Sequence, residues 1–322
     1  MGVDISVIIP SNHDHNDLIK VVKAVCNQTI KPYEILIIDS SEERGVFPED
    51  INTLCEVNSI VLTYIPLNFA MPGRARNIGI ELVKSKLIAL IDVQTIPKHY
   101  WLEVSLNLLT EKEILGVWGH TFFNANTVLE RLVRDCFYGI FPRKTLPGSI
   151  FKREVFHKVG QFIDWVRAGE DTEWMLRLEL LKTPVAHPSI ALVDYIGLIG
   201  TSRQWIKKWC RNYSASRNLP HFFPQRLLLW FVLYPLLLLI AFNWNFIIAD
   251  WRIDSPFYIG HITKIIAFTP ILIYISLRGL ILPLKRGVSI LDLLPIRFIG
   301  IILVCLIADF LKILMFSIPK KK

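Results

Sequence analysis

The sequence predicts an α/β domain followed by an α-helical membrane region, and three observations support this fold class. Apolar runs of strand length alternate with segments of helical periodicity over the first two-thirds of the 322 residues. Polar residues directly follow several of these runs, as they do at the ligand-binding edge of an open sheet. Beyond Leu227 the chain is largely apolar, in stretches long enough to cross a bilayer.

The first two elements set the pattern of the α/β part. A continuous β-branched run over Ile5–Ile9 predicts a buried strand, which Pro10 ends. Apolar residues at helical spacing predict a helix over Asp17–Asn27. Strands and helices then continue to alternate, which predicts a mainly parallel sheet covered by helices. The further strands are expected over Glu34–Ile38, Ser59–Tyr64, Leu87–Ile91 and Leu115–Trp118, and the further helices over Gly73–Val83, His99–Leu109 and from about Glu170.

Three apolar stretches near the C-terminus each have roughly the 20 residues that a membrane-spanning helix needs. They are Leu227–Ala249, Phe257–Leu277 and Phe298–Ser317. We therefore expect an α/β domain over residues 1–200, an interface helix or linker over 201–222 and a membrane region over 223–322.

The segment Ser202–Tyr213 has two interpretations. On a helix its residues Trp205, Trp209 and Tyr213 share one face, while the basic residues fall largely elsewhere. This pattern is typical of a helix that lies in the membrane interface. The alternative is a surface helix that docks its aromatic side chains on the globular domain.

The composition agrees with a membrane protein whose globular domain lies in the cytosol. The net charge of +8 arises partly from basic residues just before and between the apolar stretches, and neither a zinc spacing nor a repeated aromatic-and-basic strand motif indicates nucleic acid. The five cysteines include no C-x-x-C pair, so we expect reduced, mostly structural thiols. No basic region precedes the first apolar run, so we expect no cleavable signal peptide and a multi-pass protein of the inner or plasma membrane.

The charges near the last two stretches conflict with one another if all three stretches span. Arg278, Lys285 and Arg286 favour a cytosolic loop between the second and third stretches. A third full span would then place Lys320–Lys322 outside, against the positive-inside rule. Either the last stretch is interfacial or re-entrant, or the rule fails here.

Three predicted strands end in polar residues that could form a site. Pro10-Ser11 follows the first strand, Asp39-Ser40-Ser41 the second and Asp92-Val93-Gln94 the fourth. Because parallel strands end at the same edge of a sheet, we expect these residues to lie together. Taken alone, an aspartate after a strand is more often a turn former or a helix cap.

In order and spacing these motifs resemble those of family 2 glycosyltransferases, which have the GT-A fold, a Rossmann-like nucleotide-sugar-binding domain. The family typically reads V-S-V-I-I-P-T-Y-N, V-V-D-D-G-S, A-R-N-x-G and L-D-A-D-D. This chain has I-S-V-I-I-P-S from Ile5, I-I-D-S-S from Ile37, A-R-N-I-G from Ala75 and L-I-D-V-Q from Leu90. Further along, G-S-I-F-K-R-E-V and G-E-D-T-E are similar to the family's G-S-x-x-F-R-R-E and G-E-D-T-D. The resemblance covers roughly residues 4–200.

The resemblance implies inverting transfer of a sugar from a nucleotide-sugar donor. A carboxylate suits the base that this reaction needs, and the family places that base in the G-E-D motif, here at Asp171. Glu170 would orient the acceptor or cap the helix. The alternative is that both acids only complement a helix N-terminus.

The resemblance also implies contacts to the donor. Asp39 would hydrogen-bond the nucleobase, and the backbone of Pro10 and Ser11 would contact the nucleoside. Arg76 and Asn77 would lie near the base and phosphates. For these two residues the alternative is helix packing and surface solvation.

The family's divalent metal, Mg²⁺ or Mn²⁺, raises a question in this sequence. Asp92 matches the first acid of the metal-binding motif, but Gln94 replaces the second. An amide can ligate these cations without contributing charge, whereas hard cations favour carboxylates. Asp194 falls where many family members carry a histidine and could replace the lost ligand; the alternative is a solvated loop acid.

We therefore expect a membrane-bound glycosyltransferase at the cytosolic face that acts on a lipid-linked, polyprenyl-type acceptor or on a glycan. Such a reaction belongs to the synthesis of cell-envelope polysaccharide or glycolipid. One alternative is that the spans only anchor an enzyme with a soluble acceptor. Another, motivated by Gln94, is a catalytically silent protein that binds a nucleotide sugar or scaffolds partners.

Overall fold

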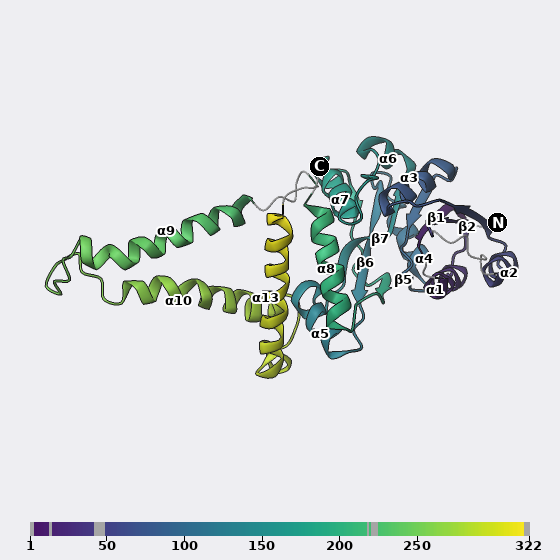
Figure 1. Ribbon diagram of the computed structural model, residues 1–322. Coiled ribbons are helices and arrows are strands. Elements are labelled where there is room, and N and C mark those ends of the chain that lie inside the picture. The colour runs from purple at the N-terminus through teal and green to yellow at the C-terminus, as the bar shows by residue number, and fades with distance from the viewer. Residues whose placement is uncertain (1–2, 13–14, 42–48, 218, 220–224, 319–322) are drawn as a thin grey trace.

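A nine-stranded mixed sheet forms the centre of the N-terminal part (Figure 1). The structure is a computed structural model that describes the chain except residues 1–2, 13–14, 42–48, 218, 220–224 and 319–322, and except the side chains of 225–232. The strands run in the order β3-β2-β1-β4-β7-β6-β9-β5, and β8 pairs with β6. The predicted α/β class is confirmed.

The parallel half of the sheet consists of the strands that the apolar runs predicted. Strand β1 pairs in parallel with β2 and β4, and β2 pairs in parallel with β3. In this register Ser11 lies beside Asp39, so the polar strand ends share one edge of the sheet. These strands are β1 (Val3–Ser11), β2 (Pro32–Asp39), β3 (Val61–Pro66) and β4 (Leu87–Leu90).

The other half of the sheet is mostly antiparallel, which the alternation of strands and helices did not predict. Strand β7 pairs antiparallel with both β4 and β6 and so reverses the direction of the sheet. Strand β9 pairs in parallel with β6 and antiparallel with β5. These strands are β5 (Thr95–Pro97), β6 (Gly116–Phe123), β7 (Arg143–Lys152), β8 (Val185–Ala186) and β9 (Val193–Tyr195).

Helices cover both faces of the sheet and bury its alternating side chains. On one face α1, α2 and α4 pack on Ile5, Val7 and Ile9, and on the other α3, α6 and α7 pack on Ile8 and Leu36. The result is a three-layer domain with two apolar cores. The helices are α1 (His15–Cys26), α2 (Glu49–Val57), α3 (Pro72–Leu82), α4 (Trp101–Leu108), α6 (Arg153–Val159) and α7 (Glu170–Leu180).

A third apolar cluster joins this domain to the C-terminal helices. Val133 and Cys136 from α5 (Val128–Val133) and the π-helical segment η1 (Arg134–Tyr138) pack with Trp205 of α8 (Ser202–Ser216). The same cluster includes Ile301 and Ala308 of α13 (Ile296–Ser317). The aromatic face of α8 therefore contacts protein, as in the alternative interpretation of this segment.

The remaining helices form a hairpin that projects away from the domain (Figure 1). Helix α9 (Gln225–Ile247) leads outward, and α10 (Ile262–Ile275) returns through η2 (Ser276–Ile281) and α11 (Leu282–Lys285). The short α12 (Ile290–Leu293) then precedes α13. Two described helices, Ile262–Lys285 and Ile296–Ser317, are long and apolar enough to cross a membrane, and the described part of α9 is a shorter apolar helix over Leu233–Ile247. The start of the first predicted span and Lys320–Lys322 lie outside the described residues.

Candidate active site

An open cavity of about 730 Å³ lies at the edge of the sheet where the parallel strands end. Pro10 and Ser11 line it from the end of β1, and Asp92 and Gln94 line it from the segment after β4. The N-terminus of α7 adds Glu170 and Asp171. Residues from three separate sequence motifs therefore meet in one cavity.

Arg76 connects two of the predicted acids. Its side chain, on α3, is buried, and its guanidinium donates to Glu170 Oε1 at 2.7 Å and to Asp92 Oδ1 at 2.8 Å. Burial alone would lower the pKa of Arg76, but the two carboxylates outweigh burial and raise it. Arg76 therefore stays charged and fixes the position of Asp92.

Glu170 is buried more deeply than Asp92. Only 5% of its side chain is exposed, against 36% for Asp92. Burial raises the pKa of Glu170, and the Arg76 guanidinium opposes that rise. Its second carboxylate oxygen, Oε2, is buried without a hydrogen-bond partner in the described structure. Glu170 therefore depends on Arg76 for its charge balance.

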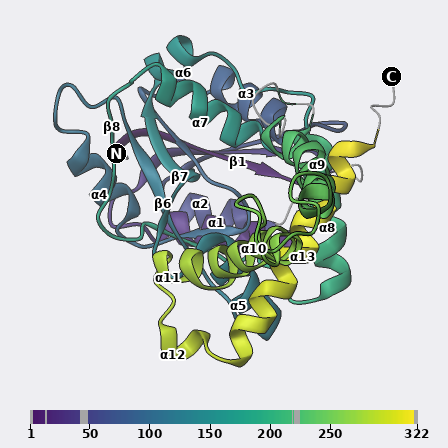
Figure 2. The same cartoon turned by 90° about the vertical axis from the view of Figure 1, so that its left-hand side faces the viewer.

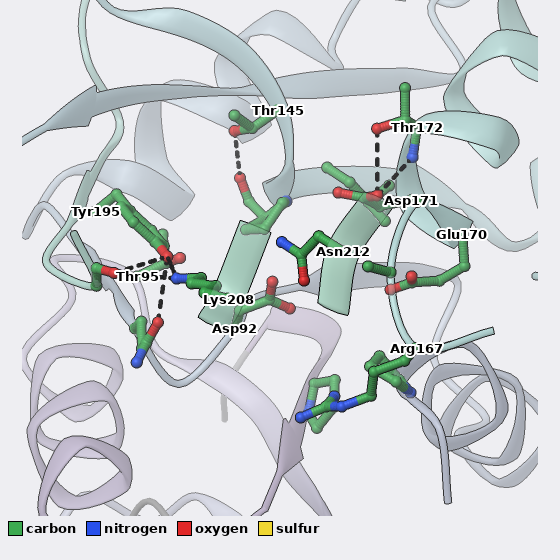
Figure 3. A pocket seen from close by; sticks show the side chains of 18 of the residues that line it. Asp92, Thr95, Thr145, Arg167, Glu170, Asp171, Thr172, Tyr195, Lys208 and Asn212 are labelled. Carbon is green, nitrogen blue, oxygen red and sulfur yellow. Dashed lines mark hydrogen bonds between the residues drawn. The ribbon is translucent and has the colours of Figure 1, made fainter. Parts of the chain in front are cut away.

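Asp171 differs from Glu170 in that it faces the cavity from the first turn of α7 (Figure 3). Its Oδ1 accepts hydrogen bonds from the backbone N–H and the hydroxyl of Thr172, at 2.7 and 3.3 Å. Gly169 precedes the helix at φ +93°, a conformation that suits glycine and turns the chain into α7 at this point. A carboxylate held in this way can accept a proton from a group in the cavity.

Two of the predicted donor contacts lie just behind the cavity wall. Asp39 is buried and accepts hydrogen bonds from the Ser41 and Tyr64 hydroxyls, while the adjacent Ser40 lines the cavity. Burial and the bond to Asp39 raise the pKa of Tyr64 to about 12. The Asn77 amide exchanges two hydrogen bonds with the backbone of Phe162, at 2.8 and 2.9 Å, and so fastens the loop before α7 to α3.

The structure does not bring Asp194 together with Asp92. Asp194 lies on β9 and pairs with Lys98 at 2.5 Å, while the next residue, Tyr195, lines the cavity. Because side chains alternate along a strand, only one of these two neighbours can face the cavity. Gln94 does line it, and its Oε1 accepts the Tyr195 hydroxyl at 3.2 Å.

The positions of Asp92, Gln94 and Asp194 determine whether the predicted Mg²⁺ or Mn²⁺ could be bound by protein ligands. No group of three or more His, Cys, Asp or Glu side chains among the described residues could hold a metal ion. Around Asp92 the donors are one carboxylate, already bonded to Arg76, and the amide of Gln94, already bonded to Tyr195. This donor set does not fit a divalent cation site made by the protein itself.

Cationic residues that the sequence did not single out line the cavity instead. Lys208 reaches it from α8, and Arg167 from the loop before α7 (Figure 3). Arg211 of α8 also lines it. The Lys208 ammonium donates to the Tyr195 hydroxyl and to the Gly197 carbonyl, both at 3.2 Å. Burial and the neighbouring Arg167 lower the pKa of Arg211, so two guanidinium groups repel each other at this wall. An anion between them would relieve that repulsion.

The same wall carries aromatic side chains and an amide. Tyr138, from η1, stacks on Phe123 with ring centroids 4.1 Å apart, and both line the cavity together with Tyr195. The Asn212 amide projects into the space between Asp92 and Asp171 (Figure 3). The sequence signal for this wall was the segment from Gln204 to Trp209, which approaches the Q-x-x-R-W motif of the family's polymer synthases but has its tryptophan one residue late.

Acids, cations and strand ends gather at the carboxyl edge of the sheet, which is where α/β domains of the nucleotide-binding class bind their ligands. Residues 6–163 match the family model Glycosyl transferase family 2. The chain is 26% identical over 194 residues to the glycosyltransferase AglE of Haloferax volcanii, a match covering 54% of this chain and 60% of AglE. It is 27% identical over 146 residues to an uncharacterized glycosyltransferase of Rickettsia conorii, covering 45% of this chain and 23% of that protein.

A solved structure supports the fold over nearly the whole chain. The mannosyltransferase PcManGT of Pyrobaculum calidifontis, in complex with GDP-Man and Mn²⁺, aligns with a TM-score of 0.52 at 13% identity. The alignment covers 97% of this chain and 88% of PcManGT. The matched region thus belongs to glycosyltransferase family 2, and the chain has the GT-A fold with C-terminal apolar helices. The chain spans less than two-thirds of the length of the two relatives matched by sequence.

Proposed function

We propose that the protein is an inverting glycosyltransferase that moves a sugar from a nucleotide-sugar donor to an acceptor hydroxyl. The observation that carries the proposal is the joint presence, in one cavity, of Asp171, Asp92 and the Pro10-Ser11 strand end. A carboxylate facing the cavity, a strand-end site for a nucleoside and several cations are the parts that this reaction needs.

In the proposed reaction Asp171 acts as the general base. The acceptor oxygen attacks the anomeric carbon of the sugar from the side opposite the nucleoside diphosphate, and the bond from that carbon to the diphosphate breaks. Asp171 accepts the proton that the acceptor hydroxyl loses. Glu170 acts through Arg76 by keeping Asp92 in place, so it is a positioning residue.

The leaving diphosphate carries negative charge that the site must stabilise. We assign this role to Lys208 and Arg211 of α8 and to Arg167, because all three line the cavity. Arg and Lys side chains stabilise phosphate oxygens well, and Arg can do so with two parallel hydrogen bonds. The Mg²⁺ or Mn²⁺ expected from the resemblance stays a prediction, and no step is assigned to it.

The acceptor is proposed to be lipid-linked, a polyprenyl phosphate or a polyprenyl-linked glycan. The cavity reaches α8 and η1, and these elements pack on the apolar helix α13. The aromatic wall of Phe123, Tyr138 and Tyr195 offers surfaces on which a sugar ring or a lipid chain can pack. We further propose that the catalytic domain works at the cytosolic face of the membrane, in the synthesis of cell-envelope glycolipid or polysaccharide.

A transfer assay tests the proposal. Membranes containing the protein are incubated with labelled nucleotide sugars and a polyprenyl phosphate, and label in the lipid fraction is measured. Wild type should transfer label, and Asp171→Asn should lose nearly all transfer. Asp164→Asn, an exposed acid outside the cavity, is the matched control and should keep it. Equal transfer by Asp171→Asn would show that the assigned base is wrong.

One observation favours the second candidate, a catalytically silent protein that binds a nucleotide sugar. Asp92 is the only carboxylate in the segment that matches the family's metal-binding motif, and it is already paired with Arg76. This candidate predicts that nucleotide sugar binds with no dependence on Mg²⁺ or Mn²⁺ and that no acceptor supports transfer. Isothermal titration with the donor, run beside the transfer assay, separates the two.

A further inference from the structure

Helix α13 has the length and composition of a membrane span, yet both of its ends are attached to the globular domain. Near its start, Arg297 pairs with the buried Asp135 of η1 at 3.4 Å. At its end, the Arg217 guanidinium, just after α8, donates to the carbonyls of Met315 and Ile318 at 3.1 and 2.7 Å. A cation at these carbonyls also stabilises the C-terminal end of the helix dipole.

Contacts continue between these two ends. The Cys136 thiol of η1 contacts the carbonyl of Ile301, and Gly300 brings α13 so close to Leu132 of α5 that an added Cβ would lie 2.9 Å from its side chain. Helix α8 packs along α13, and the buried residues Val304, Cys305 and Ala308 face the domain. A helix of 22 residues is about 33 Å long. One that touches the same domain at both ends cannot cross a bilayer away from it.

The opposite face of α13 is apolar and exposed. Ile296, Ile299, Leu303, Phe310 and Leu314 are between 41% and 82% exposed and recur at helical spacing. An exposed apolar stripe of this length on an otherwise docked helix requires a partner.

The α9–α10 hairpin indicates what that partner is. Its described side chains are mostly apolar and exposed, and only 6% of the most apolar 18-residue window within Ile262–Lys285 is buried. Helix α9 has 23 residues, about 35 Å, which exceeds the hydrocarbon core of about 30 Å. The charged tip, with Arg252 and Asp254, would then reach the far surface of the bilayer.

The hairpin leaves the domain across the axis of α13, as the two views agree (Figures 1 and 2). Where the two cross, Gly279 of η2 lies against Phe298 and Ile302 of α13, and Arg278 and Tyr274 hydrogen-bond to Asp309. If the hairpin crosses the bilayer, α13 must therefore lie along the membrane surface.

We propose that α13 is an in-plane helix whose outer face enters the lipid of the leaflet next to the catalytic domain, and that the α9–α10 hairpin provides the two membrane spans. Two cations shortly before α13, Lys285 and Arg286, suit the anionic headgroups of that leaflet. Both ends of α13 then lie on the side of the catalytic domain, which removes the conflict between a third span and the positive-inside rule. The proposal rests on the membrane association proposed above but not on the chemistry of the site.

Epitope tags test the sidedness. One tag is placed before Met1, one between Asp254 and Ser255 at the hairpin tip and one after Lys322, and protease access is measured in vesicles of both orientations. The N- and C-terminal tags should be cut from one side and the tip tag from the other. A C-terminal tag on the side of the tip would mean that α13 spans. All three tags on one side would mean that the hairpin does not. Either result overturns the proposal.

Nitroxide labels test the depth of α13 in lipid vesicles. Ile299→Cys, Leu303→Cys, Phe310→Cys and Leu314→Cys are labelled one at a time in a Cys210→Ser chain, since the other four cysteines are buried. An in-plane helix gives nearly equal depths, whereas a spanning helix separates positions 299 and 314 by about 22 Å. Labels at Ile265 and Leu272 of α10 are the control and should differ by about 10 Å.

The result is independent of catalysis. Transfer activity with a C-terminal tag on the far side would leave the proposed function intact and overturn the in-plane helix. If the tags show the expected sidedness and the labels show equal depths, but no transfer is measured, the in-plane helix is supported and the proposed function is not.

Discussion

Replacing Arg76 tests how the site is held together. In Arg76→Met the buried carboxylate of Glu170 loses its 2.7 Å partner, while the more exposed Asp92 can be solvated by water. Removing one partner of a buried ion pair typically costs about 3–5 kcal/mol. Since a large domain loses about 2–4 °C per kcal/mol, we expect the melting temperature to fall by on the order of 10 °C.

The loss should also depend on pH. Burial raises the pKa of Glu170, and without Arg76 only a backbone hydrogen bond opposes that rise. The folded variant then binds a proton more tightly than the unfolded chain, so its stability falls as pH increases through the raised pKa. The fall in melting temperature from wild type to Arg76→Met should therefore be smaller at about pH 5 than at about pH 8.

Thermal melting of the purified full chain in detergent, without nucleotide, measures both effects. Adding Glu170→Gln to Arg76→Met removes the unpaired charge and should recover part of the loss, since the two residues interact directly. The reasoning is refuted if Arg76→Met melts at the wild-type temperature, or if the double variant is no more stable than Arg76→Met.

Further predictions concern catalysis, charge, metal and the helix start. Asp171→Asn should lower the transfer rate by about 10²–10⁴-fold, with donor binding by calorimetry unchanged; a parallel loss of binding would contradict its role as base. Arg211→Met should weaken inhibition by nucleoside diphosphate by about tenfold, a loss of one charged hydrogen bond, whereas Arg203→Met, exposed on the same helix, should not; equal inhibition constants would exclude Arg211 from the phosphate site. EDTA should leave partial transfer activity if the cationic side chains supply most of the charge stabilisation; complete loss that Mn²⁺ restores would assign that role to the metal. Gly169→Ala should destabilise the chain by about 1 kcal/mol or more in thermal melts, because φ is +93° and the new Cβ would lie 2.7 Å from Leu219; an unchanged melting temperature would contradict this.

The sequence predicted the parallel half of the sheet because its strands are continuous apolar runs. Ile5–Ile9 and Leu87–Ile91 needed no tertiary information to be identified. The antiparallel half was harder, since β7 crosses Pro147 and Gly148 and its partner β6 is interrupted by Gly119. Residues Arg134–Tyr138 gave no sign of a π-helix, because that geometry depends on packing against α8 and α13.

The ordered motifs predicted which residues lie together at the site, but not which of them form ion pairs and hydrogen bonds with one another. Asp92 and Arg76 were expected near the donor, and Glu170 was expected to orient the acceptor or cap its helix. Nothing in the sequence indicated that Arg76 would join the two acids. Asp194 was singled out by its position relative to the family's pattern, and position along the sequence cannot determine which face of a short strand a residue occupies. Lys208 and Arg211 were missed because they come from a helix beyond the expected end of the catalytic domain.

That last point has a practical consequence for any attempt to separate the two halves of the protein. One face of α8 supplies Lys208, Arg211 and Asn212 to the cavity, while its other side packs on α13. A fragment that ends at residue 200 would keep all strands of the sheet but lose the wall of the cavity that α8 forms. A single helix, α8, lies between the cavity and α13. If α13 lies in lipid as proposed, we expect the rate of the proposed transfer to depend on bilayer composition.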